Sequence, residues 1–411
     1  MNCIGMIKQK GHIYLLLVVI ILGIYTASAK PPKYSNDFMY IGVGANNFGL
    51  GNAVVANTGD ITSGYWNPAG LVRIQTNLQF AYMHNEYFAS IAKYDYAGIG
   101  VPLDSNKHAF AINFMRFGVD DIPNTLDLID ADGTVNYDNV KNFSVGNYAF
   151  LLSYARNIIK GLSVGATAKI VHNKAGGFAK SWGFGVDIGA IYQIKDWKIG
   201  LTVKDITTTF NAWSFSFTDK EKQILDATDN VIPVSSTELT LPRIQFGASY
   251  NKTFKDKIEL MAELDWELTT DGKRNTLISS KAISLDPRLG VELGLWKIGY
   301  LRGGISNFQK MTNLSTGKQK FTVQPSIGVG LRYKNIVYLD YAFTDVGKTS
   351  ENQYSHVISL KVGINKRKHK ENAELINAAP QENVNGQEQP ASQPTEIQSP
   401  EKENNNNAQP K

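Results

Sequence analysis

The chain has 411 residues, with 42 lysines and arginines, 37 aspartates and glutamates and a single cysteine. A formal net charge of +5, without a basic patch interleaved with aromatic residues, argues against a nucleic-acid-binding protein. No apolar run close to twenty residues follows residue 29, which excludes a transmembrane helix in that part of the sequence.

Residues 1–29 have the features of a secretory signal peptide. Lys8 and Lys10 supply positive charge, residues 13–25 form an apolar core, and residues 27–29 (Ala-Ser-Ala) form a small-residue cleavage site. A retained anchor is the alternative, but this core is short for a membrane span. Cleavage lowers the formal net charge from +5 to +3 and removes the only cysteine, which excludes disulfides and thiolate chemistry.

Residues 76–364 contain short segments in which apolar and polar residues alternate, as expected for β-strands with two different faces. In residues 182–193, Trp182 and Phe184 fall on one face, and Gly183 and Asp187 fall on the other. We expect fourteen strands of about ten residues, the length that a tilted strand needs to cross a bilayer. Their ranges are 76–83, 88–100, 107–117, 147–157, 162–173, 182–193, 197–206, 243–252, 257–266, 287–296, 298–306, 324–333, 336–343 and 355–364.

The connections between these strands alternate between long and tight, and the longest are residues 118–146 and 207–242. All long connections therefore lie at one end, which is typical of outer-membrane barrels with short periplasmic turns and long external loops. Aromatic residues near the strand ends suit the interfacial girdles of such barrels. The sequence predicts a closed antiparallel β-barrel in the outer membrane of a Gram-negative bacterium, with a soluble β-sandwich as the alternative.

Two segments differ from the barrel wall. Residues 30–75 are rich in glycine, and we expect them to fold into the barrel as a plug, although a flexible periplasmic arm is the alternative. Residues 67–70 are interpreted as a tight turn into the first strand. Residues 365–411 are rich in Asn, Gln, Glu and Pro, which predicts a disordered polar tail on the periplasmic side.

Several short motifs resemble catalytic or metal sites without their structural context. Residues 161–165 match G-x-S-x-G, but they begin a strand and not the strand-to-helix turn that exposes a catalytic serine. Residues 130–133 (Asp-Ala-Asp-Gly) lack the later glycine and glutamate of a calcium-binding loop. The histidines show no metal-ligand spacing. We expect no catalytic site, no cofactor and no metal.

Two N-terminal motifs and several loop motifs resemble the PorV/PorQ family, which belongs to the wider FadL-like outer-membrane barrels. The first are residues 41–45 (Ile-Gly-Val-Gly-Ala) and a signature turn made of Trp66, Asn67, Pro68, Ala69 and Gly70. The turn is shared across the wider family, whereas the loop motifs are more specific. These lie at residues 116–125, 210–215, 241–243, 271–275 and 286–288. The resemblance covers about residues 36–364 and is strongest to the PorV-type branch.

The resemblance implies a fourteen-stranded barrel and a role in type IX protein secretion. PorV-like proteins associate with the outer-membrane translocon and pass exported cargo to the surface attachment machinery. The polar tail beyond residue 364 departs from typical members, which end at the last strand.

Two functions are therefore considered. The first is a secretion accessory that binds translocon and cargo through its long loops, with Trp213, Phe215 and Phe217 as the candidate partner-binding loop; packing of these rings within the loop is the alternative. The second is a FadL-like transporter of hydrophobic small molecules. The transporter needs an apolar lumen, whereas the inward-facing positions are mostly Gly, Ser, Thr, Asp, Glu and Lys, which favours the accessory. A continuous apolar tunnel would favour the transporter.

Overall fold

The computed structural model describes residues 36–365, except residues 88–89, 131, 233–234, 313–318 and 347–353. The signal peptide expected at residues 1–29 lies outside the described residues. The tail expected at residues 365–411 does so too, apart from Asn365.

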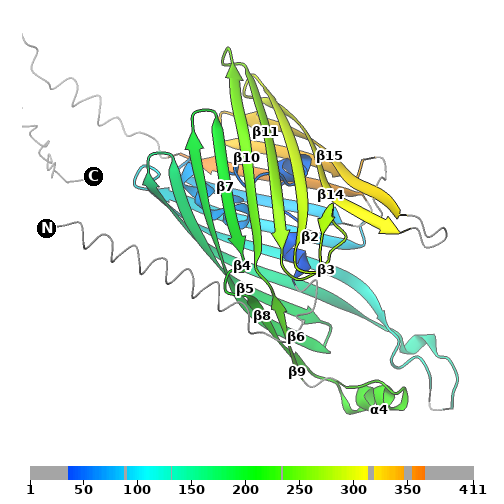
Figure 1. The fold of residues 1–411 in the computed structure, drawn as a ribbon. Helices are drawn as coiled ribbons and strands as arrows, with labels where there is room; N and C mark the ends of the chain where they lie inside the picture. Colours follow the sequence, from blue (N-terminus) through cyan, green and yellow to red (C-terminus); the bar gives the residue numbers. More distant parts are fainter. Residues whose placement is uncertain are drawn as a thin grey trace, which may run out of the picture. The chain divides into compact units, whose positions relative to one another are not determined.

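The N-terminal part of the described chain is made of short helices. They are η1 (Asp37–Tyr40), α2 (Ala45–Gly49), α3 (Ser63–Trp66) and η2 (Pro68–Arg73). Figure 1 shows this segment, in blue, enclosed by strands on all sides. No helix among the described residues is long and apolar enough to cross a membrane. We call residues 36–74 the plug.

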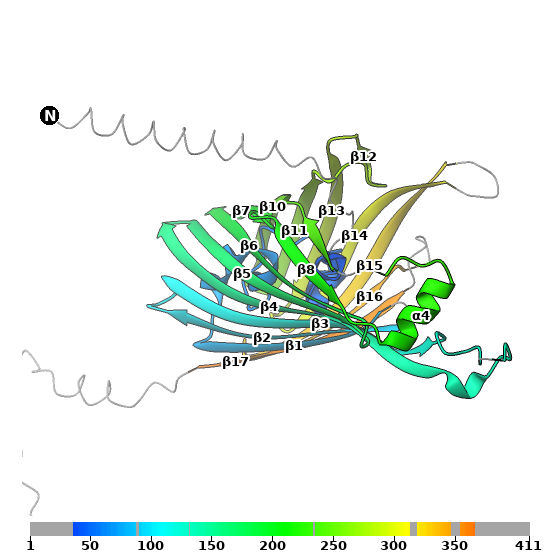
Figure 2. The same ribbon diagram turned by 90° about the horizontal axis from the view of Figure 1, so that it is seen from below.

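Fourteen antiparallel strands form the wall around the plug (Figures 1 and 2). They are β1 (Leu78–Tyr87), β2 (Ala92–Leu103), β3 (His108–Asn124), β4 (Lys141–Ile159), β5 (Leu162–Ala175), β6 (Ala179–Ile194), β7 (Trp197–Lys204), β10 (Arg243–Phe254), β11 (Ile258–Thr269), β13 (Ser284–Leu295), β14 (Gly299–Thr312), β15 (Gln319–Tyr333), β16 (Val337–Thr344) and β17 (Ser355–Ile364). The wall closes because β1 pairs with both β2 and β17, with Leu78 opposite Ile364. The predicted fourteen-stranded barrel is confirmed.

The long connection after β7 contains regular structure that the sequence pattern did not predict. It holds β8 (Thr209–Phe215), α4 (Asp219–Ala227) and β9 (Ser235–Thr240). Strand β8 continues along β6 after the register shifts by three residues near Asp205, so the β8–β9 hairpin extends the wall beyond the end of β7. Figure 2 shows α4 next to the long β3–β4 extension, and Lys220 pairs with Asp127 there at 3.0 Å. A short strand, β12 (Ile278–Ser279), pairs with β13.

The outer face of the wall is apolar. Trp182 and Phe184 of β6 are each 50% exposed, and Ile199 and Leu201 of the neighbouring β7 are 54% and 46% exposed, while Ser181 and Asp187 on the opposite face of β6 are buried. This arrangement is the reverse of a soluble protein, whose apolar residues point inward, and it is the pattern of a barrel surrounded by lipid. The predicted alternation of Trp182 and Phe184 with small and polar residues is therefore confirmed.

Candidate functional site

The signature motif lies inside the barrel and organises the plug. Trp66, 1% exposed, ends α3, and its indole nitrogen donates to the carbonyl oxygen of Val43 at 2.9 Å. Tyr65 donates from its hydroxyl to the carbonyl oxygen of Met39 at 2.7 Å. These two bonds fix the first part of the plug against the second, because buried polar groups are costly when they lack a partner.

Asn67 joins the plug to the wall. Its side-chain oxygen caps η2 by accepting from the Ala69 amide at 3.2 Å, and its amide nitrogen donates to the carbonyls of Val55, Ala190 and Leu201. Residues 67–70 therefore form a buried junction between α3 and η2. They are not the turn into the first strand that the sequence suggested, because Asn67 caps η2, residues 68–70 are its first residues, and β1 begins only at Leu78.

Glycines on both sides let the plug backbone approach the wall. A Cβ on Gly49 of the plug would lie 2.9 Å from the Cα of Gly328 on β15. A Cβ on Gly304 of β14 would collide with the backbone of Leu50 and Gly51. Such close approach of two backbones is open only to glycine.

Two carboxylates on the inner face of β11 bind four consecutive backbone amides of the plug. Asp265 accepts from Val54 at 2.7 Å and Val55 at 3.0 Å. Glu263 accepts from Ala56 at 2.6 Å and from the next amide, Asn57, at 3.1 Å. Both side chains are 1% exposed. These four bonds satisfy consecutive buried amides of the plug, so β11 is a major polar attachment of the plug.

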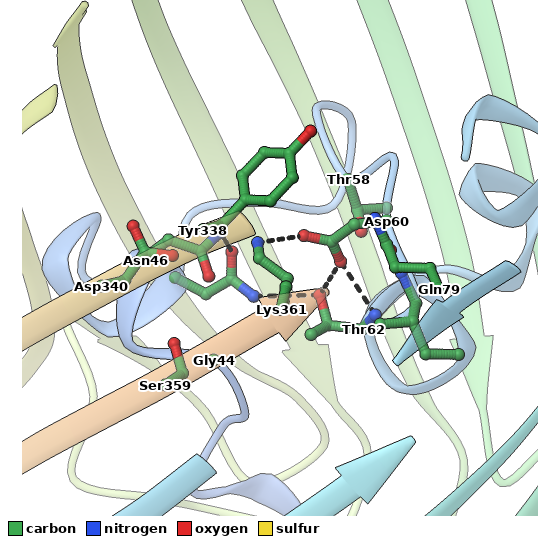
Figure 3. Close-up of polar contacts among 12 residues, drawn as sticks. Gly44, Asn46, Thr58, Asp60, Thr62, Gln79, Tyr338, Asp340, Ser359 and Lys361 are labelled. Carbon is green, nitrogen blue, oxygen red and sulfur yellow. Dashed lines mark hydrogen bonds and ion pairs between the residues drawn. The ribbon is translucent and has the colours of Figure 1, made fainter. Parts of the chain in front are cut away.

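An ion pair attaches the opposite side of the plug. Asp60 points toward Lys361 of β17, and Figure 3 shows the two side chains meeting beside Tyr338. The amide and hydroxyl of Thr62 also donate to Asp60. Burial raises the pKa of Asp60, but the Lys361 ammonium and the Thr62 hydrogen bonds outweigh burial and hold the pKa below its ordinary value. The nearby Gln79 accepts from the Ile61 amide at 2.8 Å.

A second charged network lies at the other end of the plug, near Asp205, where the register shifts between β7 and β8. Lys169 of β5 pairs with Asp187 at 2.6 Å and also contacts Asp205, to which Tyr40 of the plug donates. The Arg243 guanidinium lies 3.3 Å from the centroid of the Tyr40 ring. The plug is therefore attached to the wall at both ends by buried polar contacts.

A cavity of about 380 Å³ lies between the plug and the end of the barrel that carries the tight turns. Its wall is polar and charged: Arg302 of β14 bonds to Asp340 at 2.7 Å, and Lys198 donates to Asn57 of the plug at 2.5 Å. A smaller cavity of about 210 Å³, beside Glu267 and Arg274, is polar as well. Neither cavity is the continuous apolar tunnel that would favour a transporter.

The inner wall over β1 to β3 carries large buried apolar side chains, between polar ones at Gln79, Asn85 and Asn113. We call Met83, Tyr94, Tyr96, Met115 and Phe117 the apolar strip. All except Phe117 are at most 1% exposed, and they form part of one core with the plug. The plug amide of Gly44 lies 3.0 Å from the Met83 sulfur. The expectation of a mostly polar inner face holds on β5, β11 and β17 but fails here, because packing against the apolar plug replaces contact with water.

The predicted partner-binding residues lie on the extracellular extension. Trp213 and Phe215 belong to β8 and stack with ring centroids 6.3 Å apart. They share the face of Asn211, which is buried and donates to the plug residue Asn36. Phe217 packs against Phe178 at 6.0 Å. These rings contact one another at the barrel mouth, and their role toward a partner stays a prediction.

The two motifs that resemble catalytic and calcium sites, at residues 161–165 and 130–133, lie at the start of a wall strand and in an external loop. Ser163 lies within β5, is 1% exposed, and donates to the carbonyl of Ile191 at 3.5 Å. The carboxylate of Asp130 accepts from the amide groups of Asn136 and Asn139 in the external loop. Among the described residues, no three His, Cys, Asp or Glu side chains are grouped so that they could hold a metal ion.

The closed wall, its apolar outer face and its filled interior define a plugged outer-membrane β-barrel of a Gram-negative bacterium. No protein-family model matches the chain, and no curated protein sequence matches it.

Solved structures that resemble the chain are FadL-like outer-membrane proteins. The CymD monoaromatic hydrocarbon channel has a TM-score of 0.52 and 14% identity, over 79% of this chain and 98% of that chain. The toluene transporter TbuX of Ralstonia pickettii has a TM-score of 0.48 and 13% identity, over 79% and 99%. The toluene transporter TodX of Pseudomonas putida has a TM-score of 0.49 and 12% identity, over 78% of this chain and 97% of that chain. Of the three, the CymD structure has a TM-score above 0.5, and at 14% identity this likeness shows a shared fold. The finer PorV-type assignment stays a prediction.

Proposed function

We propose that this protein is a plugged channel that admits hydrophobic small molecules through the outer membrane. The observation that carries the proposal is the apolar strip. It extends from Phe117, whose ring lies 6.0 Å from Tyr87 at the extracellular end of β1, down to Met83 beside the plug. Methionine and aromatic side chains form adaptable surfaces that accept apolar ligands.

The plug must move for such a molecule to pass, because it fills the space beside the apolar strip. On that side the plug packs against apolar side chains and makes hydrogen bonds with Gln79 and Tyr96 through Ile61, whereas carboxylates of β11 and Lys361 of β17 bind it elsewhere. A displacement away from the apolar strip would break the hydrogen bonds of Ile61 with Gln79 and Tyr96 and the contact of Gly44 with Met83. The likeness in fold to a channel for monoaromatic hydrocarbons supports the proposal. No chemical step is part of it.

The test measures uptake of a labelled hydrophobic compound by cells in which the gene is deleted and replaced by a variant. In this variant the plug can be cross-linked to the wall by a disulfide. The amide of Ala45 donates to the hydroxyl of Ser359 on β17 at 3.1 Å, so Ala45→Cys with Ser359→Cys places two thiols close together. The mature chain has no other cysteine if residues 1–29 are removed. Oxidation should stop uptake of labelled toluene or a fatty acid, and reduction should restore it.

Each single-cysteine variant serves as the control, because it has the substitution without the cross-link. Equal uptake by oxidised and reduced cells, with the cross-link verified by mobility, would contradict the proposal. So would normal uptake in cells without the gene.

A second candidate is the type IX secretion accessory, which the signature and loop motifs of the sequence favour. The polar lining of the cavity below the plug also suits contact with a protein or peptide better than with a hydrocarbon. Deletion of the gene should then leave cargo with type IX sorting domains in the periplasm or keep it from the cell surface. Comparison of surface, medium and periplasmic proteins tests this candidate separately from uptake.

A further inference from the structure

Every tight turn at one end of the barrel carries an exposed lysine. Six turns are involved, those between β2 and β3, β4 and β5, β6 and β7, β10 and β11, β13 and β14, and β15 and β16. We call their lysines the basic rim: Lys107, Lys160, Lys195, Lys255, Lys257, Lys297 and Lys334. Among the described residues, no carboxylate lies within ion-pair distance of any of them, as the ion pairs of the chain involve other cations.

Turn geometry does not explain the lysines. Lys195, Lys255, Lys297 and Lys334 all have positive φ, between 48° and 59°. Hairpin turns with this backbone conformation prefer Gly, Asn or Asp, and an L residue with a long side chain adopts it less readily. The side chain itself must therefore account for lysine at these positions.

Apolar side chains that face the lipid flank the same turns. Trp197 follows Lys195 by two residues and is 50% exposed, and Trp296 directly precedes Lys297 and is 66% exposed. The basic rim lies where the apolar outer face of the wall ends, next to the tight turns. A lysine at this position can extend its charged end toward the lipid headgroups while its methylene groups stay in the apolar layer. A soluble acidic partner would not require this apolar border.

The connections at the opposite end of the barrel carry both signs of charge, since the β11–β13 connection has Asp271 with Lys273, Arg274 and Lys281, but the β3–β4 loop is acidic. The β3–β4 loop carries Asp127, Asp130, Asp132 and Asp138, and α4 with the residues after it adds Asp219, Asp226 and Asp229. The basic rim is therefore not a general property of the surface. Short turns lie on the periplasmic side of outer-membrane barrels, so the rim faces the phospholipid leaflet.

We propose that the basic rim binds the anionic headgroups of phospholipids in the periplasmic leaflet, with the lysine ammonium groups donating to phosphate oxygens. Attraction of this kind is electrostatic and acts within about 10 Å at moderate salt. The inference is independent of what the channel carries, since it concerns only the periplasmic edge of the wall.

The tryptophans provide the test. The full chain is reconstituted in vesicles of phosphatidylcholine in which either brominated phosphatidylglycerol or brominated phosphatidylcholine replaces a fixed fraction of the lipid. All variants keep the buried Trp66 as a constant background and retain one further tryptophan, either Trp197 at the rim or Trp182 at the other end, with the rest changed to Phe. Heat-modifiable migration verifies folding of each variant.

Brominated phosphatidylglycerol should quench Trp197 about twofold more than brominated phosphatidylcholine at the same fraction. The ratio of quenching by brominated phosphatidylglycerol to quenching by brominated phosphatidylcholine should approach one for Trp182. It should also approach one for Trp197 in a triple variant that combines Lys195→Gln, Lys255→Gln and Lys257→Gln. Lys220→Gln with Lys222→Gln on α4 is the matched control and should leave the ratio at Trp197 unchanged. Equal quenching of Trp197 by the two lipids would overturn the proposal and leave a soluble acidic partner as the explanation.

Discussion

Two adjacent glycines of β14 show how single residues control the fit of the plug. A Cβ on Gly304 would collide with the plug backbone at Leu50 and Gly51, whereas a Cβ on Gly303 would meet nothing within 4 Å. We expect Gly304→Ala to weaken plug binding by about 1–3 kcal/mol, the usual cost of overpacking, and Gly303→Ala to have little effect.

Proteinase K digestion of the folded protein checks this prediction, because a loosened plug is cleaved while the barrel keeps its heat-modifiable migration. Equal protection of the plug in the two variants would show that the backbone contact at Gly304 is not important.

The pair of Asp60 and Lys361 makes the plug sensitive to acid. Because the pKa of Asp60 is held below its ordinary value, its contribution to stability is complete above the pKa of the unfolded chain and is lost as pH falls through the folded pKa. Lys361→Met removes the ammonium group and leaves burial to raise the pKa of Asp60. The plug of this variant should therefore loosen at a higher pH than the wild type.

Hydrogen exchange of residues 58–63 between about pH 3 and about pH 7, around the ordinary aspartate pKa of about 3.9, measures the effect. Lys334→Met on the basic rim is the control, since it removes a lysine that does not contact the plug. Identical pH profiles for wild type and Lys361→Met would rule out the stated role of the ion pair.

At the scale of elements, β11 positions the plug through its alternating inner face. Glu263 and Asp265 lie two residues apart and therefore point to the same side of the strand, where they meet the amides of residues 54–57. Glu263→Ala with Asp265→Ala would leave four buried amides without their acceptors, and each such loss costs about 1–3 kcal/mol.

We expect the plug of this double variant to be displaced while the wall still forms. A steady ion conductance in planar bilayers, which the wild type lacks, would report the displacement. The matched control is Asp256→Asn, which changes a carboxylate in the exposed β10–β11 turn. A closed channel in the double variant would show that apolar packing alone holds the plug.

At the scale of the whole molecule, wall and plug have different sources of stability. The wall is held by continuous strand pairing from β1 round to β17, whereas the plug is held by contacts with the wall's inner face. Deletion of residues 36–74 should therefore leave a barrel with heat-modifiable migration and open a permanent pore. Sensitivity of cells to a large hydrophilic antibiotic such as vancomycin should rise, whereas deletion of α4 should not change it. Unchanged sensitivity with the plug deleted would mean that other parts of the chain close the barrel.

Local sequence patterns were sufficient for the wall. Strand β17 was predicted within its observed bounds, and β5 and β6 to within three residues, because period-two alternation directly reflects lipid on one side and the lumen on the other. The β8–β9 hairpin was missed because β8 has aromatic side chains on both faces, Phe210 on one and Trp213 on the other, so its sequence does not alternate between apolar and polar residues.

The candidate site could be predicted only in part. Asn67 was singled out as part of the signature turn, but its bonds to Ala190 and Leu201 join residues more than a hundred positions apart. The inward alternation of Glu263 and Asp265 was visible, yet nothing local indicated that plug amides would meet them.

The sequence by itself determined an exported chain with a fourteen-stranded wall, since strand length, alternation and turn position are local properties set by the thickness and polarity of the membrane. Only the tertiary structure decided which wall residues hold the plug, that large apolar side chains of β1 to β3 pack against it, and that the tight-turn lysines form one rim. These features depend on which surfaces closure of the barrel brings together, and that is fixed by packing between residues far apart in the chain.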